Sequence, residues 1–128
     1  MAKFNLFINY DGDIEDIAKE ISELFEIELT KKIGEDSREK YIFRFFEIEF
    51  VLFGDHELED DCGIVFSDYG YELSMIKLRS GEKYRAYDNL YENMAIFLTE
   101  RLSYAFNTNV MLVDNLQSII LESAPVAS

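Results

Sequence analysis

Cysteine, proline and tryptophan are scarce in this chain of 128 residues, which has one Cys, one Pro and no Trp. The lone Cys62 excludes an intramolecular disulfide, which suits a reducing compartment. No apolar run reaches the ~18 residues of a membrane span. The start of the chain also lacks the apolar segment of a signal peptide. We therefore expect a cytoplasmic protein without a membrane anchor.

Basic residues are missing from the central stretch of residues 45–76. The carboxylates of that stretch are Glu47, Glu49, Asp55, Glu57, Glu59, Asp60, Asp61, Asp68 and Glu72. The stretch is also rich in Phe, Ile, Val, Leu and Tyr, which favour strands. Together with a net charge of −14, this predicts a negative surface on a β framework. Such a surface repels nucleic acid and anionic membranes and attracts a basic protein.

The composition predicts one folded domain, because 48% hydrophobic and 15% aromatic residues are too many for a disordered acidic chain. We expect the domain to span residues 1–122 and residues 123–128 to form a disordered tail. Alternating patterns predict strands over residues 3–9, 26–33, 41–53, 64–68 and 71–78, and one or two short strands over 109–123. The run 41–53 is long for one strand, so it is bent or forms two strands that meet near Phe46.

Helical spacing predicts helices over residues 13–25 and 89–106, capped by Asp13 and Asp88. Asn107 can take the left-handed conformation that ends the second helix. We expect one broad stripe of that helix to be buried, with Tyr91 and Ala95 beside it: Leu90, Met94, Phe97, Leu98, Arg101, Leu102, Ala105 and Phe106. The order of elements predicts an α+β fold, a mostly antiparallel sheet with two amphipathic helices packed on one face.

Two segments contain ligand types for a metal ion without a sufficient set. The loop 55–61 combines His56 with carboxylates, but His56 is the only His in the chain. A calcium-loop pattern that starts at Asp11 has Asp16 instead of Gly at its sixth position and Ser22 instead of Glu at its twelfth. We expect no metal and no cofactor.

Glu47 and Glu49 alternate along a predicted strand, so their carboxylates lie on one side about 6.6 Å apart. Paired carboxylates at such a distance can act as general acid and base. The sequence contains no nucleophile elbow, dinucleotide fingerprint or phosphate loop near them. We therefore expect a solvent-facing pair and no enzymatic activity.

Exposed tyrosines among carboxylates favour a protein interface at a predicted hairpin tip, Asp68 to Glu72. Tyr suits interfaces because it buries a large area at a low cost in entropy. Tyr84, Tyr87 and Tyr91 form a second Tyr cluster near the second helix. The predicted partner-binding residues are Glu47, Glu49, Asp55, Glu57, Glu59, Asp60, Asp61, Asp68, Tyr69 and Tyr71.

The segments SDYGYEL (67–73) and YDNLYENMAIFLTERLSYAFNTNVMLVDN (87–115), together with the size and acidity of the chain, resemble a family of small cytoplasmic proteins. These are the immunity proteins of bacterial polymorphic toxin systems, including contact-dependent growth inhibition. The resemblance implies binding to one cognate toxin domain, often a basic nuclease, by covering its active site or a neighbouring surface. It implies no catalysis.

Three other hypotheses remain open from the residues alone. One is a nucleic-acid mimic that occupies a DNA-binding protein, which needs a long regular array of carboxylates. A second is a small enzyme or ligand-binding protein that uses Glu47, Glu49 and His56. A third is a structural subunit of a larger assembly. Either a monomer or a homodimer is compatible with the sequence.

Overall fold

The computed structural model describes residues 3–34, 38–45, 47–54, 60, 63–78 and 87–125. In order along the chain, its elements are β1 (Phe4–Ile8), α1 (Ile14–Phe25), β2 (Thr30–Ile33), β3 (Glu39–Phe45), β4 (Ile48–Gly54), the 3-10 helix η1 (Phe66–Asp68), β5 (Tyr71–Lys77), α2 (Tyr87–Phe106), β6 (Val110–Asp114) and β7 (Ser118–Ser123). The strands form one open antiparallel sheet in the order β2-β3-β4-β5-β1-β6-β7. The α+β fold with a single domain is confirmed.

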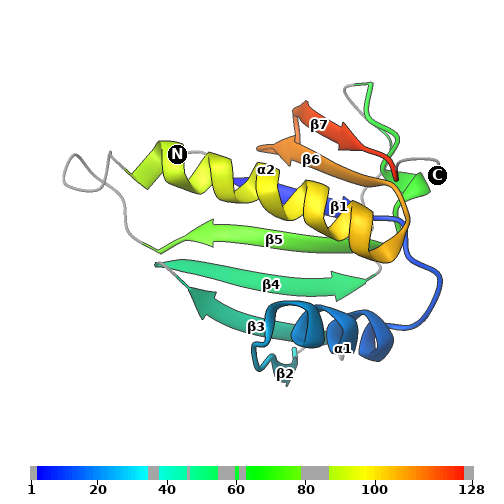
Figure 1. The fold of residues 1–128 in the computed structure, drawn as a ribbon, viewed down its shortest axis with the longest axis vertical. Coiled ribbons are helices and arrows are strands. Elements are labelled where there is room, and N and C mark those ends of the chain that lie inside the picture. Colours follow the sequence, from blue (N-terminus) through cyan, green and yellow to red (C-terminus); the bar gives the residue numbers. More distant parts are fainter. Residues whose placement is uncertain are drawn as a thin grey trace.

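Both helices cover the same face of the sheet (Figure 1). Helix α2 packs over β1, β6 and β7, and α1 packs over β4. Strand β1 lies in the interior of the sheet between β5 and β6, and all five of its residues are buried. Its alternation places Phe4, Leu6 and Ile8 in the core beneath the helices.

The second face of the sheet is also partly covered. Phe7 is fully buried and belongs to a smaller core with Ile64, Phe66, Met111 and Val113. The rings of Phe7 and Phe66 meet edge to face, 5.0 Å apart. The segment that carries η1 therefore closes part of the face opposite the helices.

Residues 41–53 form two strands and not one bent strand, which confirms the second of the two predicted alternatives. Strands β3 and β4 pair antiparallel from Lys40–Phe53 to Phe45–Ile48. The turn between them includes Glu47 in the left-handed conformation, with φ of 58°. Phe46, the expected meeting point, lies outside the described residues.

The predicted strand over residues 64–68 is wrong, and so is the hairpin about Tyr69. The segment forms η1, and its backbone is held by Asp60, whose carboxylate accepts hydrogen bonds from Ser67 N at 3.0 Å and Ser67 Oγ at 3.2 Å. A carboxylate that takes these donors favours a turn over a strand ladder. Phe66, in that turn, faces the smaller core.

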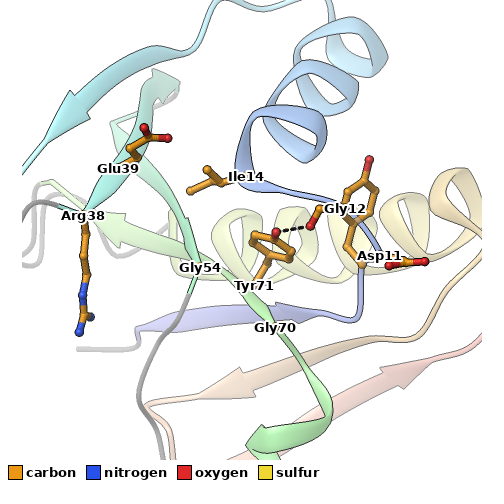
Figure 2. Close-up of a pocket in the computed structure, with 9 residues that line it drawn as sticks. Asp11, Gly12, Ile14, Arg38, Glu39, Gly54, Gly70 and Tyr71 are labelled. Carbon is orange, nitrogen blue, oxygen red and sulfur yellow. Dashed lines mark hydrogen bonds between the residues drawn. The ribbon is translucent and has the colours of Figure 1, made fainter.

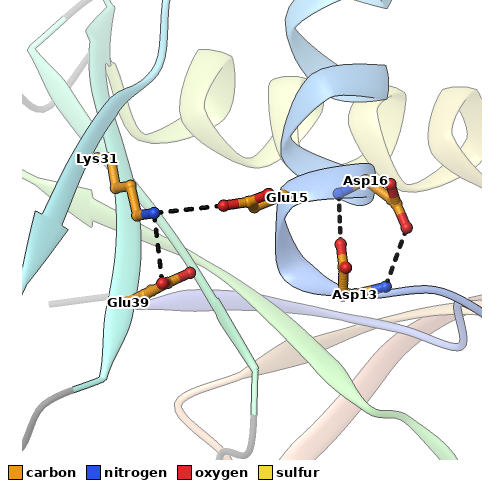
Figure 3. Close-up of polar contacts among 5 residues, drawn as sticks. All are labelled: Asp13, Glu15, Asp16, Lys31 and Glu39. Carbon is orange, nitrogen blue, oxygen red and sulfur yellow. Dashed lines mark hydrogen bonds and ion pairs between the residues drawn. The ribbon is translucent and has the colours of Figure 1, made fainter.

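Helix α1 begins with the expected cap. Asp13 and Asp16 form a reciprocal capping box, in which Asp16 N donates to Asp13 Oδ1 at 3.0 Å and Asp13 N donates to Asp16 Oδ2 at 3.3 Å (Figure 3). The helix ends at Glu26, whose φ of 53° is left-handed, and Ile27 N donates to Ser22 O at 3.1 Å. This is a Schellman motif, and it directs Ile27 back toward the core.

Lys31 joins this helix to the sheet. Its Nζ lies 3.4 Å from Glu15 Oε1 and 3.3 Å from Glu39 Oε1, so one cation bridges α1 and β3 (Figure 3). The hydrogen bond to Glu39, followed by that to Glu15, raises the pKa of Lys31. The bridge links the exposed side of α1 to the edge of the sheet.

Helix α2 is rotated relative to the predicted stripe. Leu90 and Phe97, expected in the core, are 46% and 60% exposed, whereas Tyr91 and Ala95 are fully buried. The Tyr91 hydroxyl donates to Met75 O and accepts from Phe4 N, so this side chain ties the helix to β5 and β1.

The buried side of α2 includes two hydroxyl residues that are not part of the predicted stripe. Thr99 Oγ1 donates to Ala95 O at 2.8 Å, and Ser103 Oγ lies 2.7 Å from Thr108 O and 3.0 Å from Ser123 O. Because these carbonyls satisfy the hydroxyls, both residues can be buried at little cost.

At the ends of α2, the structure corrects the predicted N-terminal cap and confirms the predicted C-terminal residue. Asp88 lies in the first turn of the helix, which starts at Tyr87, and it pairs with Lys77 instead of capping the helix. Asn107 has the expected left-handed φ of 52°. Strand β7 includes Ser123, one residue beyond the predicted domain boundary, and residues 126–128 lie outside the described residues.

Candidate protein-binding surface

Part of the predicted surface lies outside the described residues. This holds for four of the ten predicted binding residues, Asp55, Glu57, Glu59 and Asp61. It also holds for His56, Cys62 and Tyr84, while Tyr87 is described only as the first residue of α2. The other six predicted residues can be placed.

The six are not brought together in one patch. Ile48, next to Glu47, pairs with Lys77 at one end of the β4–β5 ladder, and Gly54 pairs with Tyr71 at the other end. A seven-residue strand spans about 20 Å. Glu47 and Glu49 therefore belong to one end of the sheet, and Tyr71 with its neighbours belongs to the other.

The proposed carboxylate pair is split by different local structures. Glu47 lies in the β3–β4 turn, whereas Glu49 lies within β4 opposite Arg44. Arg44 Nη2 is 3.3 Å from Glu49 Oε1, and Arg44 Nε is 3.4 Å from the same oxygen. Glu49 thus forms a cross-strand ion pair on the face opposite the helices.

Of the three predicted residues near η1, Asp60 and Tyr69 contribute to the structure of that segment. Asp60 holds Ser67, as described above, and Asp68 is exposed within η1. Tyr69 packs against the smaller core, and its burial raises its pKa, with a further contribution from Glu122 and Asp68. The half-buried Tyr69 ring therefore serves mainly to pack within the fold, and less of it is available for contact with a partner.

Tyr71 is also held within the fold. Its hydroxyl donates to Gly12 O (Figure 2). Its ring meets that of Tyr10 edge to face at 6.0 Å. Burial, followed by the charges of Asp13 and Asp16, raises the pKa of Tyr71.

A hollow of about 510 Å³ surrounds this contact, at the N-terminal end of α1. Its charged side chains diverge, since Figure 2 shows Arg38, Glu39 and Asp11 pointing in three different directions. Polar groups that converge on a common point are the mark of a catalytic or small-molecule site. The hollow does not have this arrangement.

One polar cluster is buried on the face opposite the helices. Asn5 Nδ2 donates to Glu72 Oε2 at 3.0 Å and lies 3.5 Å from Ser74 Oγ, and all three residues are less than 6% exposed. Asn5 Oδ1 has no hydrogen-bond partner within the described structure. The cluster links β1 to β5 in the middle of the sheet.

An acidic surface of the described structure is formed by residues 11–28, which we call the acidic segment. Its exposed carboxylates are Asp11, Asp13, Glu15, Asp16, Glu20, Glu23, Glu26 and Glu28, and its single basic residue is Lys19. Residues 45–76 directed the sequence-based prediction toward the loop 55–61 instead. The charge of residues 11–28 is as one-sided as that of residues 45–76. Helix capping and the polar face of an amphipathic helix account for these carboxylates, so the sequence alone did not indicate a partner there.

An apolar groove lies between α1 and α2, above β3 and β4; we call it the interhelical groove. It has a volume of about 360 Å³. The described residues that line it are all apolar: Phe25, Ile27, Phe43, Phe45, Phe50, Met94, Phe97 and Leu98. Phe45 and Phe97 are 55% and 60% exposed, so the groove opens to solvent between them. Sequence analysis missed it because the lining residues come from four separate elements.

The described residues contain no group of three or more His, Cys, Asp and Glu side chains placed to hold a metal ion. Neither described helix combines the length and the apolar character needed to cross a membrane. Comparison of the chain with protein-family models, with curated proteins and with solved structures finds no match.

Proposed function

We propose that this protein is a cytoplasmic immunity protein, which binds a basic toxin domain and neutralises it by protein–protein contact. The observation that carries the proposal is the one-sided charge of the acidic segment, where eight exposed carboxylates accompany one Lys. The resemblance of residues 67–73 and 87–115 to immunity proteins supports it.

The mechanism follows from the charge and from the apolar surface beside it. A net charge of −14 attracts a basic domain over several ångströms and raises the rate of encounter. The complex then becomes long-lived when apolar side chains are buried within a rim of charges. No catalytic step by this chain is required.

The proposal predicts that a neighbouring reading frame encodes a secreted protein with a basic C-terminal domain, and the direct test uses that domain. That domain is produced alone in cells, where we expect growth arrest, and then together with this protein, where we expect growth to recover. The purified pair should form a stable complex of defined stoichiometry by light scattering. Growth arrest that co-production does not relieve would contradict the proposal.

The rate of association should also depend on salt. At ~0.15 M salt the screening length is ~8 Å, so long-range attraction weakens while direct contacts remain. Stopped-flow measurements should therefore show an association rate that falls with ionic strength and a dissociation rate that changes less. An association rate that is constant from low to high salt would contradict electrostatic attraction by the acidic segment.

A further inference from the structure

The interhelical groove is an apolar surface that the fold itself leaves open. Phe45 and Phe97 are more than half exposed, yet they adjoin the buried side chains Phe50 and Leu98. Exposed apolar side chains that are contiguous with the core are a recurring feature of interaction sites. The volume of about 360 Å³ lies at the lower end of the ~300–1,000 Å³ of ligand pockets. It suits a few inserted side chains.

The floor of the groove is formed before any partner arrives. Phe43 and Phe50 are stacked with their ring centres 4.4 Å apart and their planes within 2°. Ile27 is fixed by the Schellman motif at the end of α1. Met94 adds an unbranched, adaptable side chain to the wall formed by α2. A preformed floor lowers the entropic cost of binding.

The charges beside the groove are mainly negative. Glu26 and Glu28 flank the lining residue Ile27, and Glu47 follows Phe45 by two residues; all three are exposed. On the α2 side, Arg101 lies one turn after Phe97. The occupant that complements this surface has apolar anchors and several positive charges.

We infer that the interhelical groove is the docking site for a basic amphipathic segment of the partner protein. Its apolar side chains enter the groove between Phe45 and Phe97, and its Lys and Arg side chains face the acidic segment. This inference rests on the proposed function, because it specifies the surface that holds the toxin domain. A second copy of this chain, also with a charge of −14, lacks the required positive charge.

A synthetic peptide tests the inference without knowledge of the toxin. The probe is an amphipathic helical peptide with Leu and a single Trp on one face and Lys and Arg on the other. The protein has no Trp, so the fluorescence of the peptide reports its burial directly. Two control peptides have the same composition in scrambled order and the same pattern with Glu in place of Lys and Arg. We expect binding with a blue shift for the probe and at least ~10-fold weaker binding for both controls.

Two variants of α2 separate the groove from the rest of the helix. Phe97→Lys places a positive charge in the groove and should weaken binding at least ~10-fold. Tyr104→Lys is the matched control, because it makes the same change in net charge at an aromatic residue of the same helix that is 71% exposed and borders a different hollow with Glu100 and Leu121. It should change the affinity less than ~2-fold. The melting temperatures of both variants test whether they are folded.

Several results would overturn the inference. Equal binding of the scrambled peptide would show general charge attraction, and unchanged affinity in Phe97→Lys would place the contact elsewhere. Displacement of the probe by a neutral detergent-like alkyl chain at low concentration would identify a small apolar ligand as the occupant. A dimer that Phe97→Lys dissociates would identify a second copy. If the peptide fails but the toxin domain is neutralised, only the docking site is rejected; if the peptide binds but growth arrest persists, only the proposed function is rejected.

Discussion

Helices α1 and α2 lie on the same face of one sheet, but they bury different kinds of side chain. Helix α1 follows the usual pattern, with Ile17, Ala18 and Ile21 buried and its carboxylates outside. Helix α2 buries Thr99 and Ser103 and exposes Phe97 and other large apolar residues. The difference indicates that the outer surface of α1 is suited to water and that of α2 is suited to contact. The interhelical groove lies where these two surfaces meet.

The test with the largest expected effect uses two aromatic residues of α2. The sequence placed Phe97 in the buried stripe with Tyr91 beside it, whereas the structure buries Tyr91 and exposes Phe97. Tyr91→Ala should destabilise the protein by about 3–5 kcal/mol, since it opens a cavity in the core and removes the contacts to Phe4 and Met75. Phe97→Ala should cost less than about 1 kcal/mol, because its ring is mostly exposed. Urea denaturation of both variants measures the difference. Equal losses would restore the predicted stripe and remove the case for an open groove.

Alkaline pH provides the second test of how α2 is buried. Burial raises the pKa of Tyr91 to about 12, whereas an unfolded chain has a Tyr pKa near 10. The contribution of the protonated Tyr91 hydroxyl to the free energy of unfolding is therefore complete below pH 10. It is lost as the pH rises from about 10 to about 12, because Tyr91 loses its proton in the unfolded chain before it does so in the folded protein. The loss attributable to Tyr91 should reach roughly 2–3 kcal/mol. Tyr91→Phe is the control, and its stability should fall less over the same range; parallel curves would contradict the burial of the hydroxyl.

The start of α1 offers a smaller effect. Asp13→Ala removes the side chain that accepts from Asp16 N and should destabilise the protein by about 1 kcal/mol. Asp11→Ala is the matched control, since Asp11 is an exposed carboxylate two residues earlier, outside the capping box. It should have a negligible effect on the midpoint of thermal unfolding. An equal effect of both substitutions would mean that reduced negative charge, and not the cap, determines the result.

The contrast between the helices also explains what the sequence could predict. For α1, the cap, the apolar spacing and the charged face all indicate the same helix, so its bounds and its cap were predicted correctly. For α2, the acceptors that satisfy Ser103 come from Thr108 and Ser123, and these are brought near only by the fold. Hydropathy alone leaves such hydroxyl residues out of the buried stripe, so the predicted buried face of α2 is rotated relative to the observed one. Spacing along one helix does not contain this information.

The candidate binding surface escaped prediction for a related reason. The ten predicted residues lie within 25 positions of the sequence, yet Glu47 and Tyr71 belong to opposite ends of the sheet because β4 separates them. The interhelical groove combines side chains that are as far apart in sequence as Phe25 and Phe97. Local composition identified that the protein is acidic and aromatic. Strand order and register decide which of these residues become neighbours.

The smallest predicted effect on stability tests the outer surface of α1. The last turn of α1 has no basic residue and contains Glu23, although the C-terminal end of a helix favours positive charge. Glu23→Arg should therefore stabilise the protein by about 0.3–1 kcal/mol. Glu100→Arg makes the same change in net charge within the interior of α2, near the hollow that contains Tyr104, and should have a smaller effect on stability.

Binding should respond in the opposite direction at Glu23. Because Glu23 belongs to the acidic segment beside the interhelical groove, Glu23→Arg should slow association with the basic peptide more than Glu100→Arg does. A variant that is more stable but binds more slowly would indicate that the carboxylates at the end of α1 serve recognition at the expense of helix stability. Equal association rates for the two variants would show that only total charge matters. The outer surface of α1 would then have no specific role in binding.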